Sequence, residues 1–227
     1  MATELEAPPR RPQIPSRAIE PAPGCYDRSS ITRDAMVTIH GQSVEEWAQS
    51  APDNQICEYI DGVVYMPSGP TEQHQDVVGF LSSLLTMLRS RLRVGPVRSG
   101  PGSLQLGGER YPQPDIFVVP PLGGEGGPPA LLVVEILSPS TRRHDLVTKS
   151  SIFREALIPD LWFVDMDRRV LKSERFVHGR YEVLEQADGI VSPSSIPGFW
   201  LDVAWLWEQP LPDPRLILDR IAAGSPT

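Results

Sequence analysis

The sequence predicts a mixed α/β (α+β) domain built around one sheet. Two continuous apolar runs, IFVV within 115–119 and LLVVEIL at 131–137, are typical of strands buried on both faces. A helical repeat of apolar residues over 71–93 precedes these runs, and a second helical pattern over 145–157 follows them. The order of helix, strands, helix and strands is that of helices packed against a sheet.

The composition is that of a globular protein. Of the 227 residues, 40% are hydrophobic and 22% are charged, and the net charge is −8. No run approaches the roughly 18 apolar residues of a membrane helix, and we expect no secretory signal, because the first residues lack an apolar core. Two cysteines cannot build a disulfide framework, so we expect a cytoplasmic protein. The negative charge argues against nonspecific coating of nucleic acid but leaves a local basic groove open.

We expect three segments along the chain. Residues 1–30 are rich in proline, and their four acids and four arginines cancel, so this segment is expected to be a flexible arm. Residues 31–209 hold the predicted helices and strands and form the domain. Residues 210–227 hold one short apolar run, LILDRIAA, and are expected to form a C-terminal tail.

Local patterns place the first elements. Ser43 and Glu46 have the spacing of a capping box, which predicts a helix over 43–49. The segment CEYIDGVVYMP predicts a hairpin that turns at Asp61-Gly62, a dipeptide typical of type I′ turns.

The later elements follow from apolar patterns and from the residues that interrupt them. Strands are expected at 104–106, 115–119 and 131–137, with prolines or glycines between them. A helix is expected over 145–157. The runs LWFVDMD, RVLKSERFV and RYEVLE predict a terminal meander, which the tryptophan-rich GFWLDVAWLWEQP closes.

Two acids stand in apolar strands, where acids are uncommon. Asp115 opens one predicted strand and Glu135 interrupts the next. A buried carboxylate costs several kcal/mol unless it is paired or bound to a cation. Taken singly, Asp115 could cap a turn and Glu135 could pair with an arginine; taken together on adjacent strands, the two acids favour a shared hard cation such as Mg²⁺.

Lysine is rare in this chain, because 19 of the 21 basic residues are arginine and only Lys149 and Lys172 are lysine. Lys149 follows Asp145 by four residues, so an ordinary helical ion pair is the simple interpretation. Arginine would serve that role equally well. A lysine ammonium is a compact charge that can sit beside a scissile phosphate, so we interpret Lys149 as functional.

Two further residues are candidates with a simpler alternative each. His74 stands near the start of the long helix and could be a surface or capping residue. Glu58 begins the hairpin and could be a third oxygen ligand or an exposed strand carboxylate. Ser138 and Ser140 lack the partner pattern of a serine hydrolase. Positive charge gathers near the candidate strands: residues 86–110 hold five arginines and one acid, as a phosphate substrate would require.

Three segments, YPQPDIFVV, LLVVEILSPSTRRHDLVTKSSIF and IPDLWFVD, resemble the Uma-two family of putative restriction endonucleases, a member of the PD-(D/E)XK superfamily. The upstream YIDGVVYMPSGPTEQHQ resembles the entry segment of that family. The resemblance covers about residues 43–207.

The resemblance implies a restriction-endonuclease-like mixed sheet flanked by helices, with Asp115 and Glu135 as metal-binding acids. In the superfamily a lysine follows the glutamate by two residues, where this chain has Leu137. The family pattern implies that Lys149 takes that role. The family usually also has tyrosines where this chain has Phe153 and Leu161, which leaves open a degenerate site.

These observations predict an Mg²⁺- or Mn²⁺-dependent endonuclease that acts on DNA. Asp115 and Glu135 would hold the metal with the carbonyl of Ile136, Lys149 would orient the attacking water, and Glu58 and His74 would assist. The main alternative is a decayed nuclease fold that binds or assembles without catalysis. A hydrolase of a smaller phosphodiester and a homodimeric assembly are also left open.

Overall fold

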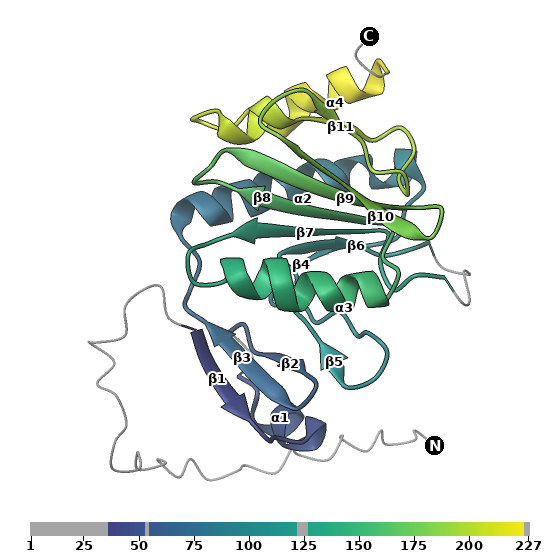
Figure 1. Cartoon of the computed structure of the whole chain (residues 1–227). Coiled ribbons are helices and arrows are strands. Elements are labelled where there is room, and N and C mark those ends of the chain that lie inside the picture. The colour runs from purple at the N-terminus through teal and green to yellow at the C-terminus, as the bar shows by residue number, and fades with distance from the viewer. Residues whose placement is uncertain (1–35, 53–54, 122–126, 225–227) are drawn as a thin grey trace, which may run out of the picture. The chain divides into compact units, whose positions relative to one another are not determined.

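The computed structural model describes residues 36–52, 55–121 and 127–224, shown in Figure 1. The arm predicted over residues 1–30 lies outside the described residues. The strands are β1 (Met36–His40), β2 (Glu58–Ile60), β3 (Val63–Pro67), β4 (Val97–Ser99), β5 (Arg110–Tyr111), β6 (Ile116–Val118), β7 (Leu132–Leu137), β8 (Asp160–Asp165), β9 (Val170–Val177), β10 (Arg180–Gln186), β11 (Ile190–Val191) and β12 (Leu201–Asp202). The helices are α1 (Val44–Ser50), α2 (Glu72–Leu92), the π-helix η2 (His144–Lys149), α3 (Ser150–Glu155), the 3₁₀-helix η3 (Val203–Trp207) and α4 (Pro214–Ala222).

A six-stranded sheet forms the centre of the domain, in the order β10-β9-β8-β7-β6-β4. Strands β7 and β8 are parallel, and the other neighbours in this sheet are antiparallel. Helix α2 covers one face and α3 covers the other (Figure 1). The mixed α/β fold class predicted from the sequence is therefore confirmed.

The alternation of side chains along β7 divides the core into two layers. Val134 and Ile136 pack with α2, whereas Val133 and Leu137 pack on the face that carries α3. Because both faces are covered, the whole strand is apolar except at Glu135. Glu135 alternates with the α2-facing residues and so belongs to the α3 face.

A second sheet, in the order β1-β3-β2-β5, carries the predicted hairpin. Its turn residues Asp61 and Gly62 have φ of 49° and 83°, as a type I′ turn requires. The capping box of α1 is also confirmed, because Ser43 Oγ accepts from the Glu46 N–H while the Glu46 carboxylate accepts from the Ser43 N–H.

The structure differs from the expected elements in three places. Residues 104–106 form no ladder, and Leu106 makes an isolated bridge with Arg110. The helix expected over 145–157 begins as the π-helix η2. The segment 210–227 contains α4, whose Ile217 and Ile221 are buried in the α2-side core. None of the described helices is both long and apolar enough to cross a membrane.

Candidate active site

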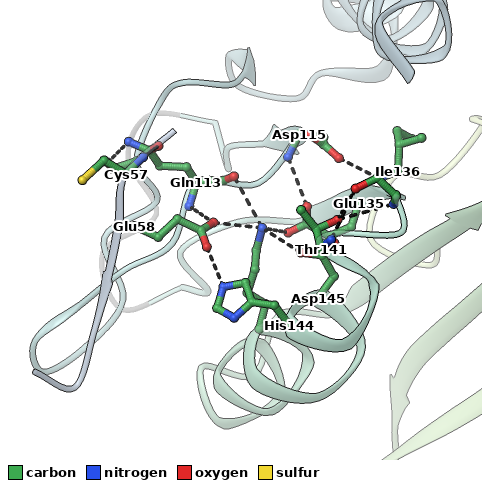
Figure 2. Close-up of polar contacts among 12 residues, drawn as sticks. Cys57, Glu58, Gln113, Asp115, Glu135, Ile136, Thr141, His144 and Asp145 are labelled. Carbon is green, nitrogen blue, oxygen red and sulfur yellow. Dashed lines mark hydrogen bonds and ion pairs between the residues drawn. The ribbon is translucent and has the colours of Figure 1, made fainter. Parts of the chain in front are cut away.

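Asp115 and Glu135 meet at the point where β6 and β7 pair. Ile116 lies opposite Val134, so the antiparallel register sets Asp115 opposite Glu135. The Asp115 backbone N–H lies 3.4 Å from Glu135 Oε2, and Asp115 Oδ2 accepts a 2.7 Å hydrogen bond from the Ile136 N–H. The structure thus brings the two predicted acids and the Ile136 backbone together (Figure 2).

Lys149 comes to the same place from η2, the helix that follows β7. Its Nζ lies 2.7 Å from Glu135 Oε1, 3.0 Å from Glu58 Oε1 and 3.3 Å from Asp145 Oδ1, and its side chain is 4% exposed. The i,i+4 pair with Asp145 therefore exists, but it is part of a buried cluster. Lys149 also donates to the Gln113 carbonyl at 3.5 Å.

Glu58, the first residue of β2, is buried and hydrogen-bonded on both oxygens. Oε1 accepts from the Gln113 N–H at 2.8 Å, and Oε2 lies 2.6 Å from His144 Nε2. Burial raises the pKa of this carboxyl, but the Lys149 ammonium and the His144 hydrogen bond outweigh burial and lower the pKa to about 2. Glu58 is therefore a fixed anion and not an exposed strand carboxylate.

Glu135 and Asp145 have the opposite shift. Burial raises the pKa of both carboxyls, and the Lys149 ammonium only partly offsets it. The neighbouring Asp115 and Glu58 carboxylates raise both values further. Like charges in a buried site disfavour ionisation, because the cluster contains more carboxyl groups than the Lys149 ammonium alone can balance.

His74 lies in the first turn of α2, which Thr71 caps. Its Nε2 is 3.1 Å from Asp115 Oδ2, so the helix brings it to the acid pair and not to the surface. Its Nδ1 is buried and has no hydrogen-bond partner among the described residues. Five of the six site residues predicted from the sequence, Glu58, His74, Asp115, Glu135 and Lys149, line one small cavity, and Ile136, the sixth, is not among its lining residues.

The cavity measures about 30 Å³, enough for a water molecule or an ion. Four acids line it, together with Lys149 and two histidines. The lining residues that carry charge or can gain it are Glu58, His74, Asp115, Glu135, His144, Asp145 and Lys149. The described part of the chain thus lines a small, partly open and acid-rich space beside one lysine.

The donor groups fit a hard divalent cation. Carboxylate and carbonyl oxygens are the ligands that Mg²⁺ prefers. Glu135 Oε1 is buried and, apart from its ion pair with Lys149, has no hydrogen-bond partner among the described residues. No three His, Cys, Asp or Glu side chains in those residues converge as a preformed metal site. The predicted set needs only Asp115, Glu135 and the Ile136 carbonyl.

Three members of the cluster were not predicted as site residues. Gln113 acts mainly through its backbone, which no sequence pattern reveals. His144 stands among arginines in TRRHD and there resembles a surface residue. Asp145 was interpreted only as an ion-pair partner of Lys149. Its four-residue spacing from Lys149 places both side chains on the same side of the helix.

Two positions where the family usually has tyrosine are packing positions in this chain. Phe153 and Leu161 are fully buried in the core on the α3 face. Phe153 and Leu161 therefore pack among apolar side chains, and neither is among the residues that line the cavity.

The sequence model of a family described as putative restriction endonuclease, Uma2, matches residues 42–204. A crystal structure of a putative nuclease belonging to DUF820 from Anabaena variabilis has a similar fold, with a TM-score of 0.61 and 19% sequence identity. That match covers 73% of this chain and 97% of the other. A comparison with curated proteins gave no match.

Proposed function

We propose that this chain, which belongs to the Uma2 family of putative restriction endonucleases, hydrolyses phosphodiester bonds in DNA with the aid of Mg²⁺ or Mn²⁺. The observation that carries the proposal is the buried meeting of Asp115, Glu135 and Lys149 beside one small cavity. Acids that served only to stabilise the fold would not need a cavity beside them. An excess of buried carboxylates is also costly unless a cation or a bound ligand offsets it.

Asp115 and Glu135, with the carbonyl of Ile136, would hold the divalent cation. Bound there, the cation would supply an activated water and offset charge on the phosphate. The excess of carboxyl groups over lysine in the cluster favours this binding. The pKa of Glu135, raised by burial and by Asp145, Asp115 and Glu58, means that proton release from this carboxyl accompanies metal binding where it is protonated.

Lys149 acts in this proposal as a charged donor and not as a base. Burial lowers the pKa of its ammonium, but Glu135, Glu58 and Asp145 outweigh burial and raise it well above the ordinary value. The side chain therefore keeps its proton at neutral pH. It can orient the attacking water and donate toward a phosphate oxygen, which is the electrostatic contribution expected of such a group.

DNA as the substrate is supported by family membership and by the excess of basic residues in the segment that follows β7. Residues 138–180 carry nine lysines or arginines against six acids. A cytoplasmic location and a homodimer, as a two-strand cut would use, are further parts of the proposal; light scattering of the purified protein tests the dimer.

Titration calorimetry with Mn²⁺ and Mg²⁺ tests the proposal, alongside cleavage of plasmid DNA. We expect the wild type to bind and cleave, and the Asp115→Ala variant to do neither while remaining folded by circular dichroism. RNA and a small phosphodiester such as bis-p-nitrophenyl phosphate are assayed in parallel to establish the substrate class. Absence of metal binding and of cleavage by the wild type would favour a decayed nuclease fold.

A further inference from the structure

The π-helix η2 gives two side chains access to one carboxylate. In a π-helix the backbone hydrogen bonds join residues five apart, and here the Ser150 N–H donates to the Asp145 carbonyl. Residues five apart therefore lie one turn above each other on the same side. His144 and Lys149 have this spacing, both are buried, and both contact Glu58.

Three hydrogen-bond donors fix Glu58 from different directions. The Gln113 N–H and the Lys149 ammonium use Oε1, and His144 uses Oε2. An ionised carboxylate can only accept, so His144 Nε2 carries the hydrogen in this contact. Figure 2 shows the Glu58 carboxylate and the His144 ring directed toward each other.

The His144 ring is itself held in place. Tyr65, on β3, packs on it with ring centroids 4.2 Å apart, and the His144 side chain is 5% exposed. The ring therefore has little freedom to turn away from Glu58. The polar partner of this ring is Glu58, whereas Lys149 reaches Glu135 directly, so the contact through which His144 can order the site is the one with Glu58.

We propose that His144 is a positioning residue, which locks the Glu58 carboxylate so that Glu58 holds the Lys149 ammonium against Glu135. Its role in cleavage rests on the proposed nuclease function, whereas its role in ordering Lys149 does not. Lys149 has several acceptors within reach, namely Glu58, Glu135, Asp145 and the Gln113 carbonyl. If the Glu58 side chain were free to rotate, the Lys149 ammonium would lose this acceptor. It could then shift among the other three acceptors.

Lysine labelling tests the ordering of Lys149 without any activity assay. The chain has two lysines, so protein labelled with ¹³C,¹⁵N-lysine gives two side-chain signals, and the Lys172→Arg variant identifies them. Lys172 is the internal reference, since its ion pair is with Glu174, at 2.6 Å, and not with Glu58. The exposed His40 provides the matched control, His40→Phe.

We expect His144→Phe to move the Lys149 signal and to speed hydrogen exchange of its ammonium about tenfold or more, with the Lys172 signal unchanged. His144→Gln keeps an N–H donor and is expected to restore most of the wild-type signal. His40→Phe should change neither signal. A Lys149 signal that is the same in wild type and in His144→Phe would overturn the proposal. If His144→Phe does not fold, His144→Gln against the shorter His144→Asn gives the same comparison.

Cleavage kinetics provide a second test of the proposal. We expect His144→Phe to lower kcat about 10- to 100-fold with little change in KM for DNA, and His144→Gln to recover part of that loss. Because His144 acts through Glu58, adding His144→Phe to Glu58→Gln should cost nothing further. Additive losses would overturn the proposal. If the wild type cleaves nothing, the nuclease function fails, and the lysine signals still decide the positioning role.

Discussion

The Lys149 ammonium lies 2.7 Å from Glu135 Oε1, and the two side chains are 4% and 2% exposed. The same ammonium is within 3.3 Å of carboxylate oxygens of Glu58 and Asp145. Three acids thus share one buried cation. In a surface ion pair, water would compensate a lost partner, but here loss of the one cation would leave three acids buried without a balancing charge. Substitutions in this cluster can therefore be compared for their effect on stability and for their effect on cleavage.

The first prediction concerns Lys149→Arg and Lys149→Met. The guanidinium is planar and larger than the ammonium, and it cannot fit the three acceptors in a cavity of about 30 Å³. We expect Lys149→Arg to abolish metal-dependent plasmid cleavage with the fold retained. Lys149→Met removes the cation and leaves the acids unbalanced, so it should cost about 3–5 kcal/mol in urea unfolding.

Lys172→Arg is the matched control for the lysine exchange, because Lys172 is the other lysine of the chain and pairs with Glu174 outside the cavity. It should cleave at the wild-type rate. Equal cleavage rates for Lys149→Arg and wild type, at matched stability, would remove Lys149 from the site.

The second prediction is that Glu135→Gln stabilises the metal-free protein. Burial, Asp145, Asp115 and Glu58 raise the pKa of this carboxyl, so ionising it costs more in the folded than in the unfolded state. The amide removes that cost. We expect a gain of about 0.5–2 kcal/mol at neutral pH, the usual size of a stabilising change, together with loss of Mn²⁺ binding and cleavage.

The stability gained by Glu135→Gln should depend on pH. A group with a raised folded pKa contributes stability at low pH and loses it as the pH rises from the unfolded to the folded pKa. The advantage of Glu135→Gln should therefore be absent near pH 4 and grow toward neutral pH, as thermal unfolding without metal can show. Glu182→Gln, an exposed change of the same kind, should show no such trend. A Glu135→Gln protein less stable than wild type at neutral pH would contradict the prediction.

The third prediction uses two glycines. A Cβ at Gly95 would lie 2.2 Å from the Pro120 carbonyl oxygen and 2.6 Å from that of Val119, both backbone atoms. Gly95→Ala should therefore destabilise the domain by at least about 1–3 kcal/mol. Gly79 stands exposed in α2 with nothing within 4 Å of the added Cβ, so Gly79→Ala should stabilise by about 0.5–1 kcal/mol. Denaturant midpoints that move in the same direction would contradict this contrast.

Strongly patterned elements could be predicted from the sequence because their signals are local. Strand β7 is apolar along its length since both faces are covered, and the turn at Asp61-Gly62 needs residues that tolerate positive φ. Strands β4 and β5 are three and two residues long and owe their existence to partners distant in sequence. No local pattern predicts them.

The strand expected at 104–106 shows how a correct burial pattern can mislead. Leu104 and Leu106 are buried at 5% and 3% exposure, as alternation suggests. Their backbone makes single contacts, from the Leu104 N–H to the Pro112 carbonyl and from the Leu106 N–H to that of Arg110, and forms no ladder. Alternating burial thus reports which side chains face the core, and not how the backbone is paired.

Part of the site could be predicted because buried charge is unusual in a sequence. Asp115 and Glu135 interrupt apolar strands, and Lys149 stands out among arginines. His144 has no such signal, because its contact with Glu58 joins residues 86 positions apart and depends on the π-helical turn. Gln113 contributes a backbone N–H and a carbonyl, groups that every residue except proline has.

The last prediction concerns Glu174, a fully buried acid on β9 outside the candidate site. Its Oε2 accepts from Arg154 Nε at 2.7 Å, and Lys172 Nζ lies 2.6 Å from Oε1. Glu174→Gln keeps the shape but removes the charge that both cations pair with. Because Arg154 and Lys172 are partly exposed, water can solvate their charges in the variant. We therefore expect the free energy of unfolding to fall by about 1.5–3 kcal/mol, the range of a hydrogen bond to a charged group.

Glu182→Gln, on the exposed β10, is the control and should change stability by less than about 0.5 kcal/mol. Urea unfolding measures both variants, and cleavage at a temperature where both are folded should equal that of wild type. A Glu174→Gln protein as stable as Glu182→Gln would show that the buried carboxylate gains nothing from its two cations.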